Sequence, residues 1–159
     1  IHLFDISSGL LVYSDDIFIG ISYYHLNRPN EAFANSGYSK LPIRMGINIG
    51  YNFYLNANSK YRQIITLTPC FLYRNQGVFR QYNIGLYLNY GIFIIGIWNR
   101  VDDSIINSFG INYKKIKFGY SFDYSINDYN RGVTHELSFN IMLECVKRNK
   151  FRPLNCPSF

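Results

Sequence analysis

Two residues near the C-terminal end of the chain are of the types that a zinc protease uses. His135 is followed by Glu136, as at the start of the helical zinc-binding motif, but Phe139 stands where that motif needs its second histidine. The flanking residues alternate as in a strand, so His135 and Ser138 lie on opposite faces and cannot act as base and nucleophile. We therefore expect no catalytic residue and no enzyme activity.

The glycine and cysteine residues also form no known cofactor or metal motif. A phosphate-binding loop is excluded because the following glycines lie on the polar side of alternating segments and precede no predicted helix: Gly46, Gly50, Gly85, Gly96, Gly110 and Gly119. Cys70, Cys145 and Cys156 have no metal-ligand spacing. We expect no cofactor and no metal, and Cys145 and Cys156 are candidates for a periplasmic disulfide.

Composition favours a β-structured membrane protein. The 159 residues are 48% hydrophobic and 16% charged, with a mean hydropathy of -0.09, which is too polar for membrane helices but typical of strands alternating between lipid and lumen. The net charge of +6 comes from scattered basic residues, so we expect no nucleic-acid partner. Residues 1–13 include Asp5 and lack a basic start, so they are not a secretory signal, and we expect the beginning of the protein to precede Ile1.

Strict alternation of apolar and polar residues defines the elements that would position these side chains. Between Ile43 and Leu55 every odd-numbered residue is apolar or aromatic, and the even-numbered residues are mainly polar or glycine. The same rule predicts about nine strands, near residues 3–13, 17–26, 43–55, 64–74, 81–90, 92–101, 105–114, 116–126 and 134–144. Each strand has about the 9 to 11 residues that a tilted strand needs to cross a bilayer. The predicted fold is an all-β, antiparallel transmembrane β-barrel.

Connections and tyrosines predict the orientation of this barrel. If the final strand ends in the periplasm, the tight turns at 14–16, 89–91 and 114–115 are periplasmic and the long connection 27–42 is extracellular. An interfacial girdle is predicted for tyrosines near strand ends: Tyr13, Tyr23, Tyr24, Tyr51, Tyr54, Tyr73, Tyr90, Tyr113 and Tyr124. We expect the protein in the outer membrane of a Gram-negative bacterium, in contact with outer-membrane lipid, with its C-terminus in the periplasm.

Two features do not fit a complete and regular barrel. Pro69 lies inside the predicted strand 64–74, where it removes a ladder hydrogen bond, so a bulge or a sheet edge is expected there. An odd number of strands leaves an open edge, which lipid does not tolerate, so further strands are expected from before Ile1 or from another chain. We thus predict that residues 1–145 are the C-terminal portion of a barrel and residues 146–159 a periplasmic tail.

Three charged residues are predicted to form one network on the lumenal side. Arg100, Asp123 and Glu136 are expected to face the lumen, because a charge on the lipid face costs about 2 to 4 kcal/mol at mid-depth. Two roles stay open for the network: fixing the shape and register of the wall, or binding cargo.

Three short motifs resemble those of the PorP/SprF family of outer-membrane proteins of the type IX secretion system. The segments 96–100 (Gly-Ile-Trp-Asn-Arg), 119–123 (Gly-Tyr-Ser-Phe-Asp) and 134–138 (Thr-His-Glu-Leu-Ser) are similar to elements of that family in order and spacing, and so are the residues around Asp5 and His25. The motif residues are Gly96, Trp98, Arg100, Gly119, Tyr120, Ser121, Asp123, His135, Glu136 and Ser138.

The resemblance implies a barrel that helps to export, or to retain at the cell surface, cargo proteins with a type IX C-terminal signal, among them gliding adhesins of Bacteroidetes. It also implies a periplasmic partner, either the PorK/PorN ring or a peptidoglycan-binding lipoprotein.

Two other classes of protein compete with this interpretation. A passive porin or solute channel would use the polar lumen as a water-filled path, although the bulky Tyr54, Tyr87 and Trp98 on the lumenal side favour occlusion. A soluble β-sandwich would need polar residues on the face that carries the apolar stripe from Ile43 to Leu55.

Overall fold

The computed structural model describes residues 4–32, 37–55, 65–126 and 132–142, and within these ranges the regular secondary structure is entirely β. The strands are β1 (Ser8–Tyr13), β2 (Ile17–Tyr24), β3 (Arg44–Tyr51), β4 (Phe53–Tyr54), β5 (Ile65–Gln76), β6 (Phe79–Tyr90), β7 (Phe93–Arg100), β8 (Ser104–Tyr113), β9 (Ile116–Ser125) and β10 (Val133–Ile141). Each predicted strand is present, with β4 as a short continuation of β3, although β1 is shorter than predicted and β5 and β6 extend further towards the turn between them. The predicted all-β, antiparallel fold is confirmed.

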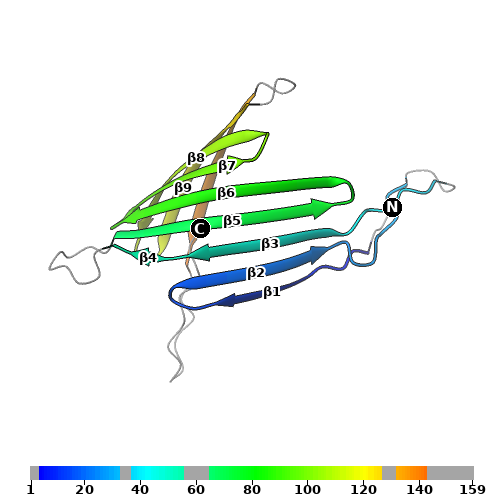
Figure 1. Ribbon diagram of the computed structural model, residues 1–159, viewed down its shortest axis with the longest axis horizontal. Coiled ribbons are helices and arrows are strands. Elements are labelled where there is room, and N and C mark those ends of the chain that lie inside the picture. The colour runs from blue at the N-terminus through cyan, green and yellow to red at the C-terminus, as the bar shows by residue number, and fades with distance from the viewer. Residues whose placement is uncertain (1–3, 33–36, 56–64, 127–131, 143–159) are drawn as a thin grey trace.

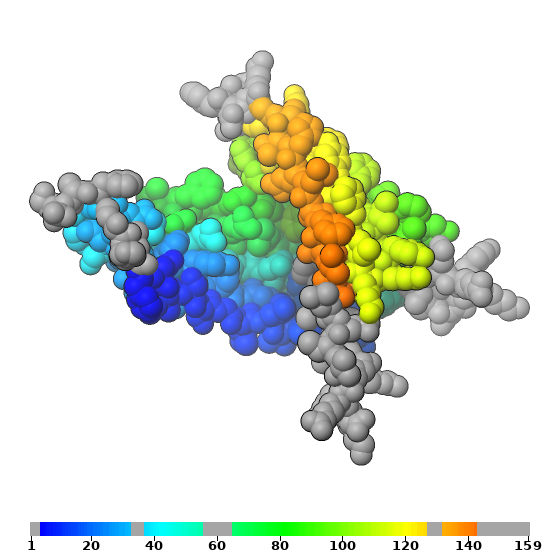
Figure 2. All heavy atoms as spheres, turned by 180° about the vertical axis from the view of Figure 1, so that it is seen from behind, coloured from blue at the N-terminus to red at the C-terminus, as the bar shows by residue number. Residues whose placement is uncertain are grey.

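The strands form one antiparallel sheet in the order β1-β2-β3-β5-β6-β7-β8-β9-β10, and β4 pairs with β5 beyond the end of β3 (Figure 1). Each strand therefore lies beside its neighbour in the chain, as is usual for consecutive strands. The sheet is curled, since β10 crosses in front of the N-terminal strands when the molecule is seen from behind (Figure 2). In the described residues the edge strands β1 and β10 each pair with one neighbour and not with each other.

Cross-strand register gives the sheet one apolar and one polar face. Ile21 pairs with Ile47, which pairs with Tyr73, and the odd-numbered residues of β2 to β5 continue this apolar surface, here called the outer face. Gly20 pairs with Asn48, which pairs with Leu72, on the opposite surface, here called the inner face. The alternation predicted for residues 43–55 is thus carried across the sheet.

The exposed apolar surface of the outer face is too large to be stable in contact with water. Leu137 and Phe139 are 73% and 63% exposed, and the middle of the outer face carries Ile, Leu and Phe side chains from neighbouring strands. Only Phe18 and Cys70 are buried hydrophobic residues in the described ranges, so these strands enclose no apolar core of their own. A continuous apolar surface of this extent requires lipid or another protein against it.

Tyrosines border this apolar band at both ends of the strands. Tyr82 and Tyr90 mark the two ends of β6 on the outer face and stand eight residues apart, which is about 26 Å along a strand. The outer-face tyrosines of the two borders are Tyr23, Tyr73, Tyr82 and Tyr124 at the end that carries the long β2–β3 connection, and Tyr51, Tyr90 and Tyr113 at the other end. The prediction was wrong for Tyr13, Tyr24 and Tyr54, whose register places them on the inner face, and it omitted Tyr82.

Turn lengths do not distinguish the two ends of the sheet. The β6–β7 and β8–β9 turns are tight as predicted, but β5 and β6 are joined by only Gly77 and Val78 at the opposite end. Gly77 has a φ of 60°, the left-handed value that a two-residue hairpin needs at its first central position. Strand β5 consequently ends later, at Gln76, and β6 begins earlier, at Phe79, than the alternation predicted. The connection 56–63 lies outside the described residues.

Pro69 produces neither a bulge nor a sheet edge, so that prediction was wrong. Strand β5 is paired on both sides, and its register with the preceding strand is unshifted from Gly50↔Cys70 to Phe53↔Leu67. Because proline has no amide proton, the ladder is interrupted opposite it, between β3 and β4. Asn52 at this gap donates its backbone N–H to the Asp16 carbonyl oxygen, and its side-chain oxygen accepts a hydrogen bond from Thr68.

Candidate functional site: the inner face of strands β6 to β10

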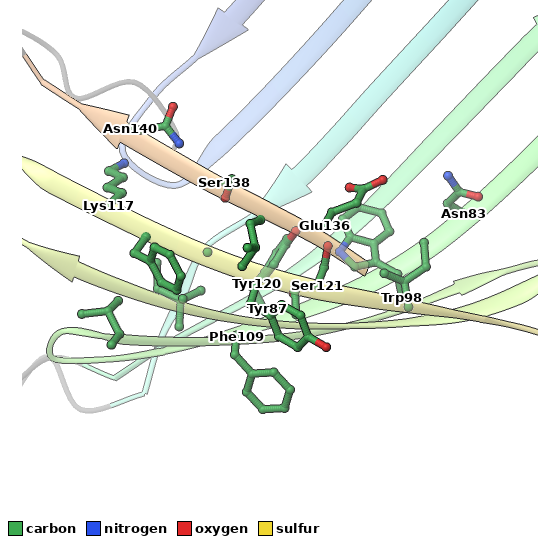
Figure 3. A pocket seen from close by; sticks show the side chains of 18 of the residues that line it. Asn83, Tyr87, Trp98, Phe109, Lys117, Tyr120, Ser121, Glu136, Ser138 and Asn140 are labelled. Carbon is green, nitrogen blue, oxygen red and sulfur yellow. The ribbon is translucent and has the colours of Figure 1, made fainter. Parts of the chain in front are cut away.

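The motif residues gather on adjacent strands, and most of them share the inner face. Ser121 pairs with Glu136 and Gly119 pairs with Ser138, so the second and third motifs lie side by side across β9 and β10. The first motif lies on β7, and β8 pairs with both β7 and β9, so one strand separates the first motif from the second. A hollow of about 400 Å³ lies over this surface, and Figure 3 shows side chains of β6, β7, β9 and β10 that line it.

Two glycines make room for two aromatic rings on the floor of the hollow. Gly85 pairs with Trp98 and Gly96 pairs with Tyr87, so each ring lies over the glycine of the neighbouring strand. A Cβ atom at Gly85 would collide with the indole ring of Trp98, and one at Gly96 would collide with Tyr87. The two rings also contact each other edge to face, with centroids 5.7 Å apart at 74°.

This packing explains part of the first motif. Gly96 leaves space for the ring of Tyr87, and Trp98 fills the space over Gly85, so each residue is one half of a glycine–ring pair. Gly85 contributes equally but lies outside the motifs. The signal for it was the alternation in residues 82–89, which puts Gly85 on the same side as Tyr87. Phe18 covers Gly50 in the same manner, although on β2 and β3.

Arg100 makes two ion pairs through one nitrogen. Its Nη1 atom lies 3.0 Å from Asp103 Oδ2 and 3.0 Å from Asp123 Oδ2, with the side chains of Arg100 and Asp123 about a quarter exposed. Strand β7 is thereby tied both to the start of β8 and to β9. Partial burial makes these charge-assisted hydrogen bonds stronger than bonds between surface side chains.

Glu136, the third predicted member of the charge network, does not join the ion pairs of Arg100 in the described residues. Glu136 is on the inner face and lines the same hollow as Arg100, but within the described ranges it forms no ion pair with Arg100. Asp103 occupies the position in the network that was predicted for Glu136. The sequence contained a weak signal for it, since Asp103 is three residues after Arg100 across a short turn.

Tyr120 and His135 are motif residues that point to the outer face. The Tyr120 hydroxyl and His135 Nδ1 are 2.8 Å apart, and the two rings are nearly parallel at 17°. This pair faces away from Ser138, which is on the inner face opposite Gly119. The described residues contain no group of three side chains able to hold a metal ion.

The residues around Asp5 and His25, which also resemble the family, form a separate hydrogen-bonded segment before β1 and after β2. Asn27 bonds through its side chain to the backbone of Phe4 and Ile6, and His25 Nδ1 lies 2.8 Å from Asp5 Oδ2. This segment holds residues 4–7 out of the sheet, so β1 begins at Ser8 rather than near residue 3. The pair Cys145 and Cys156 and the tail 146–159 lie outside the described residues.

The fold and the site together define a class of protein. A curled antiparallel sheet with an apolar outer face, tyrosine borders and a polar inner face is the wall of a transmembrane β-barrel. No helix in the described residues is long and apolar enough to cross a membrane.

The family model described as type IX secretion system membrane protein PorP/SprF matches residues 2–141, and the chain belongs to that family. It is therefore a membrane component of the type IX secretion system, as the three motifs predicted. No curated protein and no solved structure matches the chain.

Proposed function

We propose that the protein acts in the outer membrane, with its C-terminus in the periplasm, to export cargo proteins with a type IX C-terminal signal or to hold them at the cell surface. Adhesins of the gliding machinery are one such class of cargo. The observation that carries this proposal is the packed inner face of β6 to β10, where Trp98 and Tyr87 cover glycines and Arg100 joins three elements. Aromatic rings and ion pairs packed on the inner face suit a barrel that presents a surface to a protein. They suit a barrel that conducts solutes less well.

The test is removal of the gene from its own bacterium, followed by mass spectrometry of the medium, the cell surface and the periplasm. Proteins with a type IX signal should fall in the medium or on the surface and accumulate in the periplasm. The control is restoration by the full-length protein, together with outer-membrane proteins that lack the signal, whose amounts should not change. An unchanged distribution of all signal-bearing proteins would rule the proposal out.

A passive porin is the alternative, and the open hollow on the inner face is the observation in its favour. Purified full-length protein in a planar bilayer distinguishes the two. A porin should conduct steadily as purified, whereas a barrel occupied by its own side chains or a partner should not.

The periplasmic side is proposed to contact either the PorK/PorN ring or a peptidoglycan-binding lipoprotein. Chemical cross-linking in intact cells, followed by identification of the linked peptides, should recover one of these partners. Cross-links confined to barrel proteins of the outer membrane would contradict this contact.

A further inference from the structure

Two arginines are neighbours on the inner face, on strands that carry none of the three motifs. Arg44 is on β3 and Arg74 on β5; Arg74 pairs with Gly46, so the two arginines are diagonal neighbours. Both line a second hollow of about 400 Å³, which includes Ser22 and Asn48. Arg74 also borders the hollow over β6 to β10, so the two hollows meet at this residue.

Strands β1 to β7, which surround these arginines, contain no carboxylate. Glu136 on β10 lines the hollow that Arg74 borders, but it forms no ion pair with Arg74 in the described residues. Between Asp16 and Asp102 the chain has one acidic residue, Glu31, which lies in the connection between β2 and β3. Neither arginine forms an ion pair within the described residues. Two positive charges at diagonal positions of neighbouring strands repel each other, and a bound anion between them would offset that repulsion.

Arg44 is also held in place before any ligand arrives. Its guanidinium lies over the ring of Tyr24, 4.2 Å from the ring centroid. This cation–π contact fixes the position of the charge while leaving its N–H donors available. Ordering the side chain in advance lowers the entropy lost on binding.

We infer that Arg44 and Arg74 bind the carboxylates of an acidic, extended segment of a protein partner inside the barrel. Diagonal neighbours of a sheet are about 7 to 8 Å apart, and alternate residues of an extended peptide are about 6.6 Å apart. Two acidic residues separated by one residue therefore match the two guanidinium groups, each of which can donate two parallel hydrogen bonds to a carboxylate. The inner face is the one that lipid does not reach, so the anion comes through the lumen. The inference rests on the proposed function, because it assigns a chemistry to the partner that the barrel holds.

The test uses full-length protein in detergent and a fluorescein-labelled peptide that alternates Glu and Ser over eight residues. The double variant Arg44→Gln with Arg74→Gln should bind at least about tenfold more weakly, as expected for the loss of hydrogen bonds to charged groups. The matched control is Arg80→Gln, because Arg80 is an exposed arginine of the next hairpin arm that pairs with Asn75 on the outer face. Its affinity should stay within about twofold of the parent protein. Binding should also weaken as salt is raised, and the corresponding Lys-Ser peptide should not bind.

Heat-modifiable mobility on gels shows that each variant is folded. Equal binding by the parent protein and the folded double variant would overturn the inference, and so would no binding at all. Displacement of the peptide by inorganic phosphate at equal concentration would also overturn it, because the site would then hold a small anion and not a peptide. The proposed function is tested separately by the location of cargo in cells, so normal export with no peptide binding would reject this inference alone.

Discussion

At the scale of single residues, the identity of the glycine and aromatic residues on β6 and β7 is explained by side-chain packing and not by chemical reactivity. Gly85 and Gly96 are the places where an indole and a phenol ring lie directly on the neighbouring backbone. An alanine at most strand positions would be neutral or favourable, since glycine weakens a strand. At these two positions the added methyl group has no room, because it would meet the rings of Trp98 and Tyr87, which pack against each other, and at Gly96 also the Ser108 hydroxyl oxygen.

Gly85→Ala should therefore destabilise the protein by about 1 to 3 kcal/mol, as overpacking does. The measurement is the free energy of unfolding in urea for full-length protein in detergent. Gly110→Ala is the matched control, because a Cβ atom there would meet Ile94 at an ordinary 3.4 Å. A loss of stability in the control equal to that of Gly85→Ala would show that glycine flexibility, and not the ring, is what matters.

At the scale of elements, the strands are joined by turns and by one arginine. Lys114 lies in the β8–β9 turn with a φ of 53°, a left-handed conformation that side chains with a Cβ atom disfavour. The β7–β8 turn is stabilised differently, because Arg100 binds Asp103 within that turn and Asp123 on β9. The two turns thus differ in what stabilises them, and substitutions should reveal this.

Lys114→Gly should stabilise the protein by about 1 kcal/mol, because glycine adopts a positive φ without strain. Thermal unfolding of the full-length protein checks this. Lys115→Gly is the control, since Lys115 has no positive φ, and it should be neutral or destabilising. Stabilisation of both variants would indicate a general effect of charge in the turn.

Arg100→Ala should cost about 1 to 3 kcal/mol, because it leaves two partly buried carboxylates without their partner. Glu136→Gln should change stability by less than about 0.5 kcal/mol, because Glu136 is exposed and makes no ion pair with Arg100 in the described ranges. Urea unfolding of both variants and of Asp123→Asn provides the comparison. A cost for Glu136→Gln as large as that for Asp123→Asn would restore Glu136 to the network as originally predicted.

At the scale of the whole molecule, the two faces of the sheet meet different solvents. Ile97 lies opposite Leu86 in the middle of the outer face, between the two tyrosine borders. Ser121 lies on the inner face opposite Glu136. The same charged side chain should therefore have opposite consequences at these two positions.

Ile97→Arg should destabilise the folded protein in lipid vesicles by about 2 to 4 kcal/mol, the cost of a charge at mid-depth. Ser121→Arg should be tolerated to within about 1 kcal/mol, because the hollow has room and Glu136 lies next to it. Folding into vesicles at a series of urea concentrations measures both. Similar costs for the two variants would contradict the assignment of the faces.

The sequence by itself determined the strands, their faces and the family. Alternation with a period of two is a local property, so it is visible in a single segment such as 43–55 and survives in the structure unchanged. The motifs are equally local, and residues 96–100, 119–123 and 134–138 were sufficient to indicate PorP/SprF.

Only the tertiary structure decided which side chains meet. The covering of Gly85 by Trp98, the choice of Asp103 over Glu136 as partner of Arg100, and the central place of Pro69 all depend on the register between strands. Register is set jointly by turns and by pairing along the whole sheet, so a change such as the two-residue turn at Gly77 alters contacts far from it. The proximity of Arg44 and Arg74 follows from the same cause, because residues thirty positions apart in the chain become diagonal neighbours only when β3 and β5 align.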